Sequence, residues 1–292
     1  MSDKLKGTLA ILLATIIWGS TFVAQSVGVE HIGPFTFLTV RCFLAVIALL
    51  PMIALQNRGR FFEILTSKKL WRAGIPCGIA LFIASALQQV GLLYTTAGKG
   101  GFITAMYIVL VPIFGLMFRR KPPKTALFSV AIAAVGLYFI SGAGITSINI
   151  GDLLMLLCAV AFSFQILFID KLSPGVDSVA LNMVQSLVCA LISGFFMFLF
   201  EEPKMDLILI SWFPLVYAGV LSMGVAYTLQ IVGQKKLEPT TASLLMSFES
   251  VFAALSGWLL LNEKLSWIEC FGCALVMGAI LISQIPNKNA AH

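Results

Sequence analysis

The chain has 292 residues, of which 59% are hydrophobic and only 11% are charged. Soluble domains carry about 25% charged residues, so the composition excludes a cytosolic globular enzyme, a disordered chain and a secreted disulfide scaffold. It indicates a polytopic helical membrane protein. The net charge of +6 does not indicate a nucleic-acid partner, because the basic residues form short clusters between apolar runs, where they act as topology signals.

Ten apolar runs are long enough to cross a bilayer, which requires about 20 residues. In chain order they cover residues 7–27, 34–55, 72–95, 100–118, 124–142, 151–170, 178–200, 212–234, 240–261 and 266–285. None of the connections is long enough for a folded soluble domain. The first run is too long for the core of a signal peptide and has no A-x-A cleavage site, so we expect it to remain as the first helix.

The basic residues predict the orientation of these spans. With the N-terminus in the cytoplasm, the inner segments contain 15 Lys and Arg residues and the outer loops contain 3. The remaining one, Arg41, lies inside the second run. By the positive-inside rule, the sequence predicts that both termini are cytoplasmic.

The two halves of the chain resemble each other. The segment Gly-Leu-Tyr-Phe-Ile-Ser from Gly136 parallels Gly-Ala-Ile-Leu-Ile-Ser from Gly278, an offset of 142 residues, and Gln88 matches Gln230 at the same offset. We therefore predict two five-helix repeats, residues 1–146 and 147–292. Because five is odd, the second repeat would be inverted in the membrane, which is a pattern of secondary transporters.

Several short motifs carry a family resemblance. They are Trp18-Gly19-Ser20, Arg41 in the second run, residues 91–98 leading into 105–112, residues 248–252, and residues 262–265. In this order they resemble the EamA-type family of the drug/metabolite transporter superfamily, over nearly the whole chain. Ser250 stands where the family's E-P-V run has proline, and Asn262 where its G-E-x-L run has glycine. The resemblance implies export or exchange of small metabolites across the plasma (inner) membrane of a bacterium.

Two charged residues fall at membrane depth, where an ionisable group is a functional candidate. Arg41 lies ~10 Å into its helix from Pro34 and Glu249 lies ~15 Å from Pro239, close to the midplane. Arg41 could hold a carboxylate, and Glu249 could contact an amine or carry a coupling proton. Alternatively, the two form a structural ion pair, or Arg41 extends to the outer interface and Glu249 bonds a neighbouring helix. Together they would suit a zwitterion.

Uncharged polar residues supply further candidates for substrate contact. Trp18, Thr21 and Gln25 share one helix face. The others are Gln88, Tyr107, Gln185, Tyr227 and Ser247. Each could instead form a hydrogen bond between helices. Pro112, near the middle of the fourth run, removes a backbone hydrogen bond and is either a gating hinge or a fixed kink.

Other chemistry finds little support in the sequence. There is no G-x-x-x-x-G-K-[ST] motif for ATP, and the two histidines lie in an outer loop and at the C-terminus. We therefore expect no enzyme activity, no metal and no cofactor. Cys270 and Cys273 read as small helix residues, and Ser266 with Glu269 as a capping box.

The sequence thus predicts an all-α membrane protein with ten transmembrane helices in two inverted repeats. We expect a secondary transporter that exports or exchanges small, amino-acid-like metabolites by alternating access. Drugs or hydrophobic cations are the alternative substrates, and a membrane enzyme or a non-transporting subunit is the alternative from another class. The expected partners are a small-molecule substrate and the lipid bilayer. A coupling proton and the choice between monomer and homodimer stay open.

Overall fold

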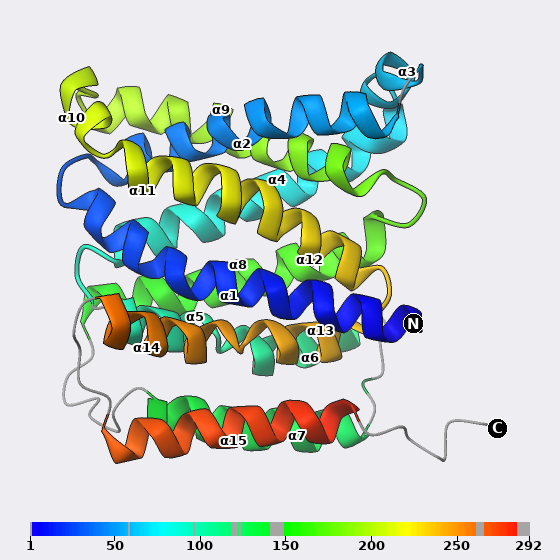
Figure 1. The fold of residues 1–292 in the computed structure, drawn as a ribbon, viewed down its shortest axis with the longest axis vertical. Coiled ribbons are helices and arrows are strands. Elements are labelled where there is room, and N and C mark those ends of the chain that lie inside the picture. Colours follow the sequence, from blue (N-terminus) through cyan, green and yellow to red (C-terminus); the bar gives the residue numbers. More distant parts are fainter. Residues whose placement is uncertain are drawn as a thin grey trace.

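A computed structural model describes residues 2–57, 59–95, 97–117, 122, 124–140, 149–260 and 266–284, and these form helices without strands (Figure 1). Eight helical spans are long and apolar enough to cross a membrane. They are α1 (Asp3–Val29), α2 (Pro34–Gln56), α4 (Lys68–Gly91), Lys99–Met117, α8 (Ile150–Leu172), α9 (Ser178–Phe200), Trp212–Gln234 and Pro239–Leu260. The all-helical membrane fold class is thus confirmed.

Two further apolar helices are α7 (Lys124–Ile140) and α15 (Trp267–Gln284). Their apolar stretches, Lys124–Phe139 and Cys270–Ile282, are shorter than those of the eight spans. The two helices pack side by side at one end of the long axis of the molecule, and α7 also contacts α6, α13 and α14 (Figure 1). Short helices α3 (Phe61–Leu65) and α10 (Met205–Ile210) lie at opposite ends of the spans. The start of α1 and the end of α15 lie on the same side of the bundle (Figure 1).

Three of the spans are not continuous α-helices. The span Lys99–Met117 is divided into α5 (Ala97–Thr104) and α6 (Tyr107–Met117), and the span Pro239–Leu260 into α13 (Pro239–Met246) and α14 (Glu249–Leu260). The third consists of α11 (Trp212–Val216), a π-helical segment η1 (Tyr217–Ala226) and α12 (Tyr227–Gln234). Interrupted helices of this kind are common at functional sites within membranes.

The two divided spans are interrupted in the same way. In the first, Met106, Ile108 and Val109 donate their N–H groups three residues back instead of four. In the second, Phe248, Ser250 and Val251 do the same, each 142 residues later. Tight i→i−3 bonds of this type narrow the helix locally and change its direction.

Polar side chains fix where several helices begin. The side chain of Asp177 accepts a hydrogen bond from the Ala180 N–H at the start of α9, and Asn149 with Asp152 forms a capping box at the start of α8. The N-terminus of α2 is capped from another helix, since Glu201 at the end of α9 accepts bonds from the backbone of Phe35 and Thr36. These carboxylates satisfy N–H groups that have no partner within the helix.

A glycine lets α1 and α14 meet at backbone distance. A Cβ atom added at Gly19 would overlap Phe252 and the backbone of Ala253. Small residues allow such close approach between membrane helices. The contact places the polar face of α1 directly beside the start of α14, where Glu249 lies.

Candidate functional site

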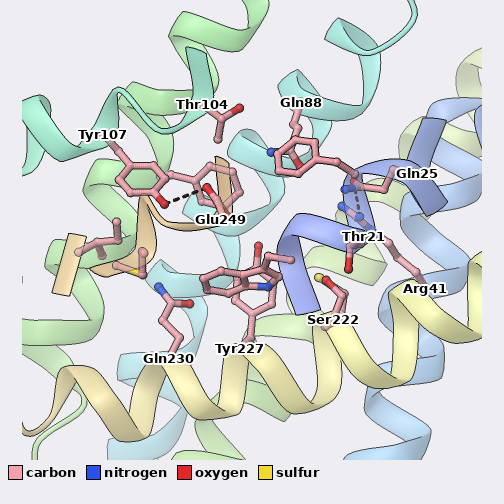
Figure 2. A pocket seen from close by; sticks show the side chains of 16 residues that line it. Thr21, Gln25, Arg41, Gln88, Thr104, Tyr107, Ser222, Tyr227, Gln230 and Glu249 are labelled. Carbon is pink, nitrogen blue, oxygen red and sulfur yellow. Dashed lines mark hydrogen bonds between the residues drawn. The ribbon is translucent and has the colours of Figure 1, made fainter. Parts of the chain in front are cut away.

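A central cavity lies between the helices of both halves of the chain (Figure 2). Sixteen side chains line it, and they come from α1, α2, α4, α5, α6, α8, η1, α12, α13 and α14. Eight of them are residues that the sequence singled out, namely Trp18, Thr21, Gln25, Arg41, Gln88, Tyr107, Tyr227 and Glu249. Residues far apart in the sequence are thus brought to one place.

The other eight lining residues were not among the predicted site residues, although the sequence had already matched one of them, Gln230, to Gln88. They are Phe22, Thr104, Phe162, Ile166, Ser222, Met223, Gln230 and Met246. The correspondence between the two halves, at an offset of 142 or 144 residues, is the signal that could have found half of them. Phe162 follows Trp18 by 144 residues and Ile166 follows Phe22 by 144, while Met246 follows Thr104 by 142 and Gln230 follows Gln88 by 142.

Arg41 enters the cavity from α2. Its Nη1 donates a hydrogen bond to Gln25 Oε1 of α1, 2.5 Å away, and its guanidinium carbon lies 5.7 Å from the centre of the Phe37 ring. The residue is 3% exposed, so the alternative of a side chain extended to the interface does not fit. Its Nε has no hydrogen-bond partner among the described residues.

Glu249 and Tyr107 form the opposite polar group of the cavity (Figure 2). The Tyr107 hydroxyl donates to Glu249 Oε1 at 2.8 Å. Each of the two is the first residue of the half-helix that follows a break, Tyr107 in α6 and Glu249 in α14. They are 142 residues apart, which is also the offset between the two breaks.

Arg41 and Glu249 share the cavity without pairing with each other. Within the described part of the chain, Arg41 bonds an amide and Glu249 bonds a phenol, and no ion pair joins them. The structural ion pair considered from the sequence is therefore not formed. Arg41 and Glu249 each form a single side-chain hydrogen bond with the described residues, so each keeps donors or acceptors for a polar or charged ligand group.

Two more cavity residues keep buried polar atoms without a partner among the described residues. These atoms are the indole Nε1 of Trp18, a donor, and the Oε1 of Gln230, an acceptor. Trp18 also meets Tyr227 edge-on, with ring centres 5.0 Å apart. In the part of the chain that the structure describes, the cavity thus combines a basic and an acidic side chain, two unpaired donors, an unpaired acceptor and an aromatic wall.

Two predicted residues do not line the cavity. Ser247 lies in the α13–α14 break, where its hydroxyl donates to the Leu244 carbonyl. Gln185 belongs to a separate chain of amides, in which it donates to Asn182 and accepts from Gln165. Gln230 donates to Gln165 and so connects this amide chain to the cavity.

Pro112 lies inside α6, and the interruption of this span is at Ala105 and Met106, before α6 begins. Whether Pro112 acts as a hinge stays a prediction. The side chain of Glu269, predicted to cap the last helix, and the loop residues Asn262, Glu263 and Lys264 lie outside the described residues.

The cavity is small. Its volume is only about 40 Å³, which corresponds to about three water molecules. Binding sites for small metabolites enclose hundreds of cubic ångströms. The cavity in this structure is therefore smaller than such a site.

Helices that cross the bilayer, a charged cavity at their centre and paired helix breaks around it define the architecture of a membrane solute transporter. The comparison with known families agrees. The sequence model of the EamA-like transporter family matches residues 5–142 and again residues 149–284. The chain belongs to the EamA-like transporter family, within the drug/metabolite transporter superfamily.

Relatives of known name are transporters as well. An uncharacterized transporter of Archaeoglobus fulgidus is 34% identical over 97% of this chain and 87% of its own length. YoaV of Bacillus subtilis, an uncharacterized transporter, is 23% identical over 95% and 94%. YedA of Escherichia coli K12, an uncharacterized inner membrane transporter, is 24% identical over 94% and 89%.

The fold also has a counterpart among solved structures. One crystal structure superposes with a TM-score of 0.75, at 20% sequence identity, over 95% of this chain and 96% of the other. This similarity concerns the fold alone.

Proposed function

We propose that the chain is a secondary transporter that exports or exchanges small zwitterionic metabolites, of which amino acids are the simplest. The observation that carries this proposal is the pair Arg41 and Glu249, a basic and an acidic side chain that line one buried cavity without pairing with each other. A carboxylate held by Arg41 and an ammonium held by Glu249 would satisfy both. Trp18 and Tyr227 would contact the part of the substrate between them.

We further propose transport by alternating access between two inverted repeats, residues 1–146 and 147–292. Three features support this. The family matches twice, in residues 5–142 and 149–284, the breaks in α5–α6 and α13–α14 recur at an offset of 142 residues, and the cavity is too small for a metabolite in this structure. Half-helices that meet at the cavity can tilt independently and open it to one side at a time.

Glu249 is also the candidate site for a coupling proton. Its partner is the Tyr107 hydroxyl rather than a cation, so its protonation would not break an ion pair. The relative in Escherichia coli is described as an inner membrane transporter, and we propose the inner membrane for this chain too, with both termini in the cytoplasm. No catalytic role or cofactor is part of the proposal.

The test is counterflow in proteoliposomes with a panel of labelled amino acids. Wild-type protein should accumulate at least one of them. Arg41→Ala and Glu249→Gln should each reduce the kcat/KM for transport about 30-fold or more, because removing one partner of a buried charged contact costs 2 kcal/mol or more. Arg60→Ala with Glu63→Gln, which removes an exposed ion pair, is the matched control and should transport normally.

Each other result has a definite meaning. Normal transport of a proven substrate by the double variant of Arg41 and Glu249 would overturn the site. Accumulation of no amino acid would remove this substrate class. Loss with Glu249→Gln but not with Arg41→Ala would favour hydrophobic cations, because only the carboxylate would then matter.

A further inference from the structure

An apolar groove runs along the seam between α4 and α8, outside the central cavity. Its walls are formed by Pro76, Ile79, Ile83 and Leu87 of α4 and by Phe164 and Phe168 of α8, and its volume is about 590 Å³. Between Pro76 and Leu87 the groove follows α4 for about 16 Å. Phe164 stacks on Phe114 of α6, with ring centres 4.9 Å apart, so this wall is held in place.

The groove continues into a second pocket at the end of α4 that lies on the side of the N-terminus. Pro76 lines both. The second pocket has a volume of about 490 Å³ and is lined by polar as well as apolar residues, among them Lys68, Trp71 and Arg72. Lys68, Arg72, Ile75 and Ile79 follow each other at intervals of three or four residues, so they lie on one face of α4.

The second pocket has the character of a membrane interface. Lys68 and Arg72 are exposed, and no ion pair to either is formed within the described part of the chain. The indole Nε1 of Trp71 donates to the Leu65 carbonyl at 2.7 Å, which fixes the ring beside these two cations. Tryptophan and basic residues at the end of a spanning helix are typical of the lipid headgroup level.

We propose that this continuous surface binds an anionic phospholipid of the leaflet on the N-terminal side. The phosphate and the anionic headgroup contact Lys68 and Arg72, and one acyl chain occupies the apolar groove between α4 and α8. The charge of the pocket selects the anionic headgroup, and the groove lies at the depth where acyl chains surround the protein. The site is independent of the transported substrate.

The groove and the central cavity lie on opposite sides of the same helix, α4. Leu87 lines the groove, and the next residue, Gln88, lines the central cavity. A lipid chain seated against α4 therefore supports, from the outside, a helix that forms the cavity wall on the inside.

Native mass spectrometry of the purified full-length protein tests the proposal. The protein is offered equal amounts of phosphatidylglycerol and phosphatidylcholine with identical acyl chains. Wild type should retain phosphatidylglycerol preferentially. Lys68→Gln with Arg72→Gln should reduce this preference about 25-fold, since each basic residue contributes about a fivefold attraction. Lys4→Gln with Lys6→Gln removes two exposed charges at the start of α1 and should leave the preference unchanged.

A second variant tests the acyl-chain part. Ala161→Phe fills the groove and should lower phosphatidylglycerol retention at least fivefold although both cations remain, with thermal unfolding as the check of folding. The proposal is overturned if the Lys68 and Arg72 variant keeps its preference for phosphatidylglycerol. It is also overturned if the control variant of Lys4 and Lys6 loses that preference to the same extent. Full retention by a folded Ala161→Phe variant overturns the groove as the chain site.

Discussion

At the residue scale, Tyr107 and Glu249 show how the cavity is built. Both begin a half-helix immediately after a break, and the hydroxyl of one donates to the carboxylate of the other at 2.8 Å. The sequence could suggest both residues because they are polar groups in apolar runs. It could not show that they bond each other, since they are 142 residues apart.

Replacing Tyr107 with Phe tests the role of this hydrogen bond. The variant keeps the ring and removes the donor to Glu249, so we expect the kcat/KM for transport to fall about tenfold, in line with about 1.5 kcal/mol for a hydrogen bond to a charged group. Counterflow measurements check this. Tyr94→Phe, at an exposed tyrosine, is the matched control, and equal activity of the two variants would contradict the prediction.

Glu201 supports the structure rather than the cavity. Its carboxylate accepts bonds from the backbone N–H groups of Phe35 and Thr36 and from the Thr36 hydroxyl, at 2.6–2.8 Å. Glu201→Ala should lower stability by about 1–3 kcal/mol, because the first turn of α2 loses its capping partner. The thermal unfolding midpoint in detergent measures this. Glu202→Ala, at the exposed neighbour, should leave the midpoint unchanged.

The residues that could be predicted share one property. Arg41, Glu249 and Gln88 are conspicuous because polar groups are expensive in a membrane. Phe162, Ile166 and Met246 also line the cavity, but apolar residues within a membrane helix look the same whether they face lipid or substrate. Gln185 met the same polar criterion as Gln88, yet it bonds other amides outside the cavity.

At the scale of the elements, the close contact between α1 and α14 is the most sensitive packing position. Gly19→Ala should lower the free energy of unfolding by about 1–3 kcal/mol or more. The added methyl group overlaps Phe252 and backbone atoms of α14, and neither helix can shift without moving the cavity wall. The yield of folded protein in size-exclusion chromatography and the unfolding midpoint measure this effect.

Gly278→Ala is the matched control for this change. It places the same methyl group in α15, where nothing lies within 4 Å of the added atom. Because alanine favours a helix more than glycine does, this variant should be at least as stable as wild type. A Gly19→Ala variant as stable as Gly278→Ala would show that the α1–α14 contact does not constrain the fold.

The helix breaks were not predictable from local sequence. The apolar runs predicted where the spans lie, and Pro112 predicted a kink within the fourth run, residues 100–118. The interruption instead lies at Ala105–Met106, and its counterpart at Ser247–Phe248, where neither glycine nor proline is present. Tertiary packing around the cavity, not local propensity, decides these positions.

At the scale of the whole molecule, the distribution of basic residues predicts orientation. The start of α1 and the end of α15 lie on the same side of the bundle (Figure 1), so both termini should report the same compartment. Green fluorescent protein fused to the C-terminus should fluoresce in bacteria, and alkaline phosphatase fused there should be inactive, because the positive-inside rule places this end in the cytoplasm. An active phosphatase fusion would reverse the assigned orientation.

The contact between Tyr107 and Glu249 has a consequence for the history of the chain. If the two halves descend from one duplicated sequence, these equivalent positions once carried the same amino acid, and the ancestral pair met across a symmetry axis. Such a protein would have had no chemical difference between its two directions. In that case the divergence into a phenol and a carboxyl group would have made the two sides of the cavity centre chemically different.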